Sequence, residues 1–296
     1  MSAADVTTPA APAVAVEPSP LRQTLTAALR QGRTRVGLVL TALLVLVALA
    51  GPLVAPHSPE ELVGPPNSGE GVLGTDYLGR DVLTRVLYGG ASVLWMAVSA
   101  ATIAAFLGLW IGLVAAYSRS WLDGLLMRGM DVLLAFPNIV FVLVVVSMIG
   151  PESWLIVGSV AIAHTPGFAR IVRASALGVV RREFVEAAEV LGVPRRRILL
   201  REILPNITTP LLVEYGFRLT WAIMLIAALS FLGLGVQPPN ADWGLMINEN
   251  RVGVAVQPLA VAIPALCIAV FTVGTNLISE GLARALAGVD RRTGAA

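Results

Sequence analysis

The residues that could carry out chemistry are few in this chain, and they lie far apart in the sequence. There is one cysteine, Cys267, and there are two histidines, His57 and His164. A histidine without clustered Cys, Asp or Glu is a poor metal site, and a lone cysteine forms neither an internal disulfide nor a metal cluster. The sequence also shows no GxSxG nucleophile elbow and no HExxH helix. We therefore expect no catalytic residues and no metal site, which argues against an intramembrane protease or acyltransferase.

The absence of lysine bears on nucleotide chemistry. All 21 basic residues are arginine. A Walker A phosphate loop needs a lysine that reaches the β- and γ-phosphates, so this chain is not expected to bind or hydrolyse ATP by itself. The arginine bias suggests either phosphate or nucleic-acid binding or a GC-rich genome, and we favour the genome; no nucleic-acid partner is expected.

The densest group of charged residues is EFVEAAEVLGVPRRRILLREILPN, which runs from Glu183 to Asn206. Its first part predicts a short helix with one apolar face, because apolar residues recur there at i, i+3, i+4 and i+7. The residues of this face are Phe184, Ala187, Ala188 and Leu191.

A corner and a second helix follow that face. Gly192 lies where a left-handed helix cap is expected, and Pro194 suits the first turn of a second helix. Pro205 restricts Leu204 and is expected to end this second helix before the next apolar run. Such a helix–glycine–helix unit could be a compact knob that a partner protein moves. It could equally be an amphipathic hairpin lying on lipid headgroups.

The rest of the chain must hold this unit in a membrane. The sequence is 56% hydrophobic and only 14% charged, and its mean hydropathy is +0.78. A span needs about 20 apolar residues. Six segments qualify and predict an all-α integral membrane protein: 36–55, 93–117, 132–150, 154–170, 208–235 and 257–279.

The remaining segments complete the predicted domain plan. Residues 1–30 are expected to be a disordered tail, 31–290 the membrane domain with the charged loop at 171–206, and 291–296 a second tail. Within the spans, Pro137 and Pro166 predict kinks. Gly108 and Gly112 have a small-xxx-small spacing that predicts close helix packing.

The arginines predict the orientation, because cytoplasmic loops retain basic residues. With the N-terminus inside, seventeen arginines lie in inner segments and three in outer loops. Both termini and the charged loop are therefore predicted to be cytoplasmic. The outer loop 57–92 has helical apolar spacing near Leu78, Val82 and Val86, which indicates either a surface amphipathic helix or a helix packed on the bundle.

The charged stretch resembles the EAA loop of ATP-binding-cassette importer permeases. Six residues match that pattern in type and spacing, whereas Glu202 occupies the place of its isoleucine. The matching residues are Glu186, Ala187, Ala188, Gly192, Leu204 and Pro205.

Further segments resemble one branch, the dipeptide/oligopeptide/nickel permeases, and within it the C-type subunit. They are GTDYLGRDVLTRVLYG (74–89), MDVLLAFP (130–137), FARIVRA (168–174), LSFLGLGVQPP (229–239), WG (243–244) and GLARAL (281–286). The resemblance covers about residues 30–290 and implies the type I importer permease fold with six spans and cytoplasmic coupling helices.

The resemblance also implies the partners and the coupling residues. Such a permease lies in the inner (plasma) membrane of a bacterial cell. It pairs with a second homologous permease, two ATPases that use ATP and Mg, and an extracytoplasmic substrate-binding protein. ATPase closure would move the knob, and the adjoining spans would carry that motion into the pore. The residues expected to couple are Glu183, Glu186, Ala187, Ala188, Gly192, Pro194, Leu204 and Pro205.

The fifth span is expected to line the pore. Glu214 and Arg218 are four residues apart and share a helix face, so they are either a substrate-path or gate pair or a structural ion pair. Trp221 and Met224 are further candidates. The resemblance implies uptake of di- or oligopeptides, with nickel chelates or glutathione as alternatives. A secondary transporter is disfavoured, because no internal repeat and few intramembrane charges are visible.

Overall fold

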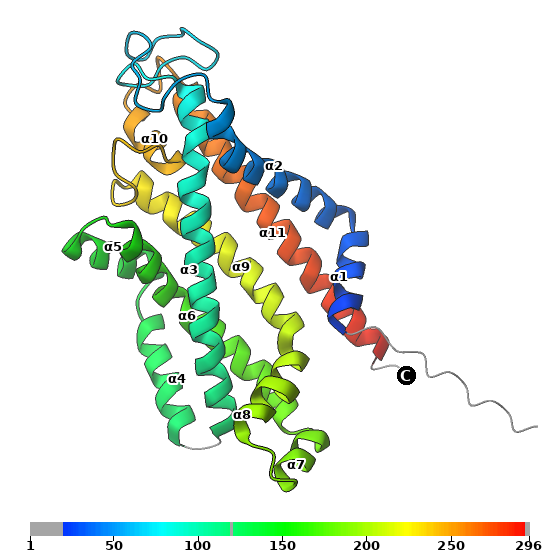
Figure 1. Ribbon diagram of the computed structural model, residues 1–296. Helices are drawn as coiled ribbons and strands as arrows, with labels where there is room; N and C mark the ends of the chain where they lie inside the picture. The colour runs from blue at the N-terminus through cyan, green and yellow to red at the C-terminus, as the bar shows by residue number, and fades with distance from the viewer. Residues whose placement is uncertain (1–19, 119–120, 294–296) are drawn as a thin grey trace, which may run out of the picture.

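The computed structural model describes residues 20–118 and 121–293, and every named element in these ranges is a helix. Figure 1 shows their arrangement. In chain order they are α1 (Pro20–Arg30), α2 (Gly32–Val54), α3 (Val82–Ser118), α4 (Trp121–Leu134), α5 (Asn138–Ile149), α6 (Ser153–Val180), α7 (Glu183–Val190), α8 (Arg195–Arg197), the π-helix η1 (Ile198–Ile203), α9 (Leu204–Phe231), α10 (Trp243–Asn250) and α11 (Leu259–Thr293).

Five helical segments are long and apolar enough to cross a membrane, which confirms the all-α membrane fold. A sixth span arises only if α4 and α5 are counted together, and these two helices meet at an angle of 79°. The predicted span 132–150 is therefore not one straight helix. The bend falls just before α5 at Pro137, where the expected kink occurs, since proline disrupts the helical hydrogen-bond ladder.

Several predicted boundaries were wrong because helices continue into segments that carry charge. α3 begins at Val82 rather than at residue 93, and α6 continues to Val180 rather than ending at 170. The predicted coupling loop 171–206 thus starts with ten helical residues. α9 differs in the other direction at its end, since it stops at Phe231 rather than at 235. The predicted disordered tail is helical from Pro20 to Arg30, while residues 1–19 and 294–296 lie outside the described ranges.

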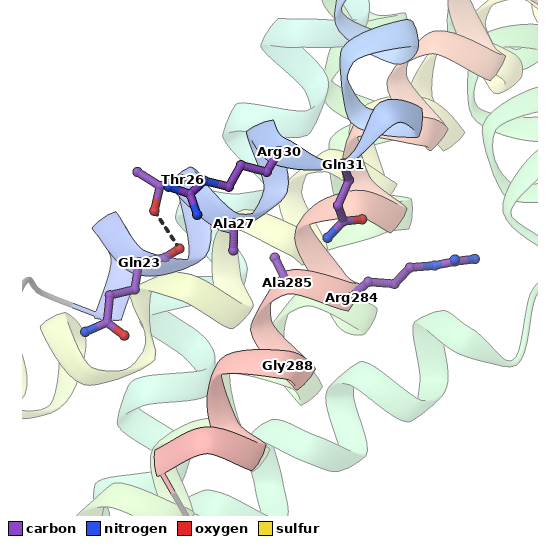
Figure 2. A pocket seen from close by; sticks show the side chains of 8 residues that line it. All are labelled: Gln23, Thr26, Ala27, Arg30, Gln31, Arg284, Ala285 and Gly288. Atoms are coloured by element: carbon purple, nitrogen blue, oxygen red, sulfur yellow. Dashed lines mark hydrogen bonds between the residues drawn. The ribbon is translucent and has the colours of Figure 1, made fainter.

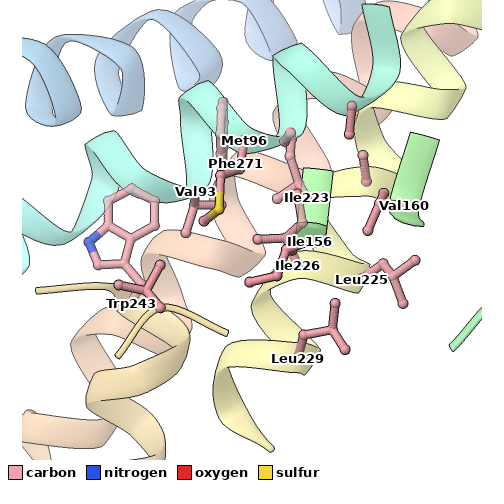
Figure 3. Packing of buried hydrophobic residues seen from close by; sticks show 14 of the residues in the cluster. Val93, Met96, Ile156, Val160, Ile223, Leu225, Ile226, Leu229, Trp243 and Phe271 are labelled. Carbon is pink, nitrogen blue, oxygen red and sulfur yellow. The ribbon is translucent and has the colours of Figure 1, made fainter. Parts of the chain in front are cut away.

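The bundle is centred on α3 and α6, which make the most extensive helix–helix contact. Gly112 permits that approach, since a Cβ at this position would lie 2.5 Å from the carbonyl oxygen of Ala169. The predicted close packing at this spacing is confirmed. Figure 3 shows the apolar core between α3, α6, α9, α10 and α11, whose labelled members include Met96, Ile156, Ile226 and Phe271.

The two ends of the bundle differ in construction (Figure 1). One end, which we call the cap, consists of residues 55–92 and 232–258, including α10 and the first turns of α3. The other end carries the knob, which consists of residues 183–205 with α7, α8 and η1. α4 contributes no buried residue and is held to α6 by a bidentate ion pair in which Arg173 donates to both Asp123 carboxylate oxygens at 2.6 Å.

Candidate functional site

The corner of the knob is closed by a double hydrogen bond at the end of α7. The Val193 N–H donates to the Ala188 carbonyl and the Gly192 N–H to the Glu189 carbonyl, both at 3.0 Å. Gly192 has φ +73°, the left-handed conformation that this Schellman arrangement requires and that glycine adopts without steric cost. The predicted glycine cap is therefore confirmed.

The second helix of the knob does not end at Pro205, contrary to the expectation. Residues Arg195–Phe231 form one continuous helical segment, and Pro205 lies in the first turn of α9. The Leu204 N–H donates to Leu199, five residues earlier, so the helix is widened into a π-turn just before the proline. A widened turn accommodates a ring that would otherwise clash with the preceding turn. The knob is thus joined to α9 without a break.

Buried apolar side chains anchor the knob to the bundle. Val185, Ile198 and Ile203 are fully buried in a second apolar cluster, which also includes Phe168 of α6 and Leu113 of α3. The Arg195 guanidinium lies 5.9 Å from the ring centre of Tyr117, near the end of α3. Val185, which the sequence analysis did not single out, is the side chain of α7 that holds this helix in place.

The predicted apolar face of α7 points largely to the surface. Leu191 is 80% exposed and Val190 beside it is 87% exposed, while Phe184 is also exposed. Ala188 is only partly exposed. Large apolar side chains at an exposed tip are unfavourable in water, and such a patch is typical of a surface that contacts another protein or a membrane.

Acidic side chains surround this tip, and most of the predicted coupling residues are exposed. Among these residues, Ala188 and Leu204 are partly buried. The exposed members are Glu183, Glu186, Ala187, Gly192, Pro194 and Pro205, with Glu189 beside them. The structure therefore brings the predicted coupling residues together on one projecting unit.

The predicted pair on α9 forms as expected. The Arg218 Nε donates to Glu214 Oε1 at 2.6 Å, and the two side chains are 23% and 14% exposed. A Cβ on Gly167 of α6 would overlap the Arg218 guanidinium, so the arginine fills a notch made by this glycine. Trp221 and Met224, further along α9, are exposed.

Glu214 also faces a groove of about 300 Å³ between α6, α9 and α11. Its remaining lining is almost entirely apolar. The residues are Ile171, Pro210, Val213, Phe217, Ala283, Leu286 and Ala287. Within the described residues no group of three His, Cys, Asp or Glu could hold a metal ion.

The cap contains a buried ionic cluster that sequence reasoning missed. The Arg80 Nε donates to Asp76 Oδ2 at 2.6 Å, and Arg80 and Arg85 contact Glu249 Oε2 at 3.2 and 2.9 Å. All four side chains are at most 6% exposed. The Tyr77 hydroxyl donates to Glu249 as well, at 3.2 Å. Two positive and two negative charges thus neutralise one another away from water.

A buried tryptophan joins the same elements. Trp243 of α10 donates its indole N–H to the Val86 carbonyl of α3 at 2.9 Å. A Cβ on Gly90 would lie 2.6 Å from the Trp243 ring, and a Cβ on Gly244 would lie 2.5 Å from the Ala227 carbonyl oxygen of α9. The segments 74–89 and 243–244, far apart in the sequence, therefore meet in the cap. Val82 and Val86 are buried, so the predicted outer helix is packed on the bundle and does not lie on the surface.

Asp242 completes the contact between α3 and α10. It is fully buried, caps α10 by accepting from the Gly244 and Leu245 N–H groups, and accepts from the Ser92 hydroxyl at 2.7 Å. Burial raises the pKa of the Asp242 carboxyl above its ordinary value, while the Ser92 hydrogen bond acts in the opposite direction. The sequence signals for this region were the apolar helical spacing near Val82 and Val86 and the family-like segments 74–89 and 243–244, neither of which predicts that the charged side chains pair.

Comparison with known proteins gives a consistent result over most of the chain. Residues 108–288 match the family model described as binding-protein-dependent transport system inner membrane component. The chain is 38% identical to a putative peptide transport system permease protein of Brucella suis, over 89% of this chain and 90% of the relative.

Two further relatives carry different substrate names. The chain is 36% identical to a dipeptide transport system permease protein of Alkalihalophilus pseudofirmus, over 85% of this chain and 84% of the relative. It is 37% identical to a glutathione transport system permease protein of Escherichia coli O6:K15:H31, over 87% of this chain and 86% of the relative.

Proposed function

Since the chain belongs to the binding-protein-dependent transport system inner membrane components, we propose that it forms half of the pore of an importer for short peptides. It is a multi-pass inner-membrane protein and the permease subunit of an ATP-binding-cassette importer, not itself the ATPase. The membrane domain comprises residues 31–290, and a second, homologous permease supplies the other half of the pore.

The exposed apolar tip of the knob is the observation that carries the coupling assignment. Val190 and Leu191 project into solvent, while Val185 and Ile198 fix the base of the knob in the bundle. A groove on an ATPase subunit would cover the apolar tip, and the glutamates around it would set the register. Two ATPases bind ATP and Mg, and their closure displaces the knob together with α9, to which it is joined without a break.

The proposed orientation in the membrane rests on the placement of charge. Seventeen of the 21 arginines lie in the segments predicted to be on the inner side, which supports a cytoplasmic knob, cytoplasmic termini and an outward-facing cap. The extracytoplasmic substrate-binding protein then delivers its cargo at the cap end. α9 carries the pore-lining candidates Glu214, Arg218, Trp221 and Met224.

Short peptides are the substrate class that the relatives support best. Their names refer to peptides, dipeptides and glutathione, and glutathione is itself a peptide-like molecule. The Glu214–Arg218 pair offers one acceptor and one donor of opposite charge beside a mostly apolar groove. This arrangement suits a zwitterionic solute whose ends carry an ammonium and a carboxylate.

The proposal is tested by reconstituting the chain together with the proteins encoded by the genes next to its own. The chain should co-purify with two ATPase subunits and a second permease, and proteoliposomes should accumulate labelled dipeptide only with ATP and the binding protein. Competition by unlabelled tripeptides and by glutathione then ranks the substrates. Uphill uptake by the chain without any ATPase would instead identify a secondary transporter.

The coupling role of the corner is tested by Gly192→Trp. The left-handed φ and the exposed position predict that the substitution distorts the knob but leaves the spans inserted. We expect dipeptide uptake to fall by at least tenfold, while ATP hydrolysis persists and no longer responds to the binding protein. Gly69→Trp is the matched control, because a Cβ at this cap position meets nothing within 4 Å. Normal uptake by Gly192→Trp would refute the assignment.

A further inference from the structure

α1 and the last turns of α11 enclose a groove of about 490 Å³ on the half of the molecule away from the cap (Figure 1). Among the described residues, two arginines and no acidic residue line it. Figure 2 shows its lining, which consists of Gln23, Thr26, Ala27, Arg30, Gln31, Arg284, Ala285 and Gly288. Neither the family assignment nor the proposed transport function uses this groove.

The charges around the groove favour an anion. Arg30 makes no ion pair within the part of the chain that the structure describes, and the Arg284 guanidinium pairs only with Glu280. Arg33 lies 3.9 Å from the same Glu280 carboxylate. Arg33 and Arg284 thus share one carboxylate and Arg30 has none, so these described side chains around the groove carry a net charge of +2. Figure 2 shows the Arg30 and Arg284 side chains at opposite margins of the groove.

The surface beside the groove favours an anion that carries a hydrocarbon chain. Leu25 and Leu29 of α1 are exposed, although their neighbours Ala28 and Thr24 are buried. α2 continues this apolar surface with its exposed residues Val36, Val39 and Leu43. An amphipathic helix with basic residues near a membrane-spanning segment is typical of sites that contact anionic lipid.

We propose that this groove binds the phosphate headgroup of an anionic phospholipid in the leaflet at the knob end. The Arg30 and Arg284 guanidiniums donate to the phosphate oxygens. The acyl chains lie along Leu25, Leu29 and the exposed face of α2. This site is independent of the solute that the importer carries.

The test is native mass spectrometry of the full-length chain, purified from membranes with its partner subunits in mild detergent. Dioleoylphosphatidylglycerol is titrated in, with zwitterionic dioleoylphosphatidylcholine as the reference lipid. We expect Arg30→Gln/Arg284→Gln to weaken phosphatidylglycerol retention about thirtyfold. The control Arg22→Gln/Arg128→Gln removes the same charge at exposed positions outside the groove and should bind like the parent protein.

Three further arms separate this site from its alternatives. Gly288→Leu adds volume without changing charge, and since a Cβ there meets nothing within 4 Å, it should fold normally and still reduce retention. Full displacement of the lipid by inorganic phosphate would show a free-anion site, and equal retention of phosphatidylglycerol and phosphatidylcholine would show that the groove does not recognise the headgroup charge. Either result, or equal retention in the parent and the double variant, would overturn the proposal.

Discussion

The cap and the knob differ in the burial of their charged and apolar side chains. In the cap, Arg85 and Glu249 are buried and paired, and Trp243 is enclosed. In the knob, the glutamates and Leu191 are exposed. A buried ion cluster is stable only when its partners remain in place, whereas an exposed apolar tip is stable only when something else covers it. The difference teaches that the cap is completed within this chain, whereas the described residues leave the apolar tip of the knob uncovered.

The sharpest way to break this comparison is to remove the shared acid of the cap. Glu249→Ala leaves Arg80 and Arg85 buried with one carboxylate fewer, and we expect a loss of about 3–5 kcal/mol in the free energy of unfolding. This loss is measured as a fall in the thermal unfolding midpoint of the detergent-solubilised protein. Size-exclusion chromatography after heating determines the fraction that stays folded at each temperature. Glu186→Ala at the exposed surface of the knob is the matched control and should leave the midpoint unchanged. Equal midpoints for the two variants would contradict the contrast between the ends.

A smaller loss is expected where the cap packs most tightly. Gly90→Ala places a methyl group 2.6 Å from the Trp243 ring and 2.9 Å from the Ala48 Cβ, so overpacking should cost about 1–3 kcal/mol. Intrinsic tryptophan fluorescence during thermal unfolding reports the change. Gly69→Ala, in the same cap but with open space around it, should stay within about 0.5 kcal/mol of the parent. If Gly69→Ala were the more harmful change, the packing account of the cap would be wrong.

The smallest effect on stability is expected at the tip of the knob. Because the Leu191 side chain lies in solvent, Leu191→Asp should change the free energy of unfolding by less than about 0.5 kcal/mol. We expect the same variant to lose its ATPase subunits during affinity purification, because a charge would be buried in the proposed groove. Leu78→Asp, at an exposed position of the cap, should retain them. Unimpaired co-purification of Leu191→Asp would show that the tip does not contact the ATPases.

Much of this architecture could be predicted from local sequence. Hydropathy located the apolar middle of each span, and the glycine at 192 predicted the corner because its left-handed conformation is a local property. The helix boundaries were less predictable. Arg85 is a charge inside a helix, and it is tolerated there only because Glu249 reaches it from 164 residues away. Pairing at that sequence distance is set by tertiary packing and leaves no periodic signal.

The continuous helix that joins the knob to α9 could not be predicted from the sequence, for a related reason. Pro205 normally predicts the end of a helix, and nothing in the residues before it announces a π-turn. The widened turn depends on the burial of Ile198 and Ile203 beneath it, which sequence alone does not reveal. Local rules thus predicted the residues of the knob that we propose to couple, but not the unbroken helical connection that joins them to the span.

α3 is the one described helix of more than 20 residues that contains no proline. It runs unbroken for 37 residues, from Val82, just after Asp81, which accepts from the Thr84 N–H at the start of the helix, to Ser118, just after the Tyr117 that meets Arg195. At 1.5 Å per residue such a rod is roughly 55 Å long, so a tilt of about 5° about one end moves the other end by roughly 5 Å. A displacement of this size is comparable to the width of a peptide backbone. A straight helix can transmit it across the membrane without any hinge.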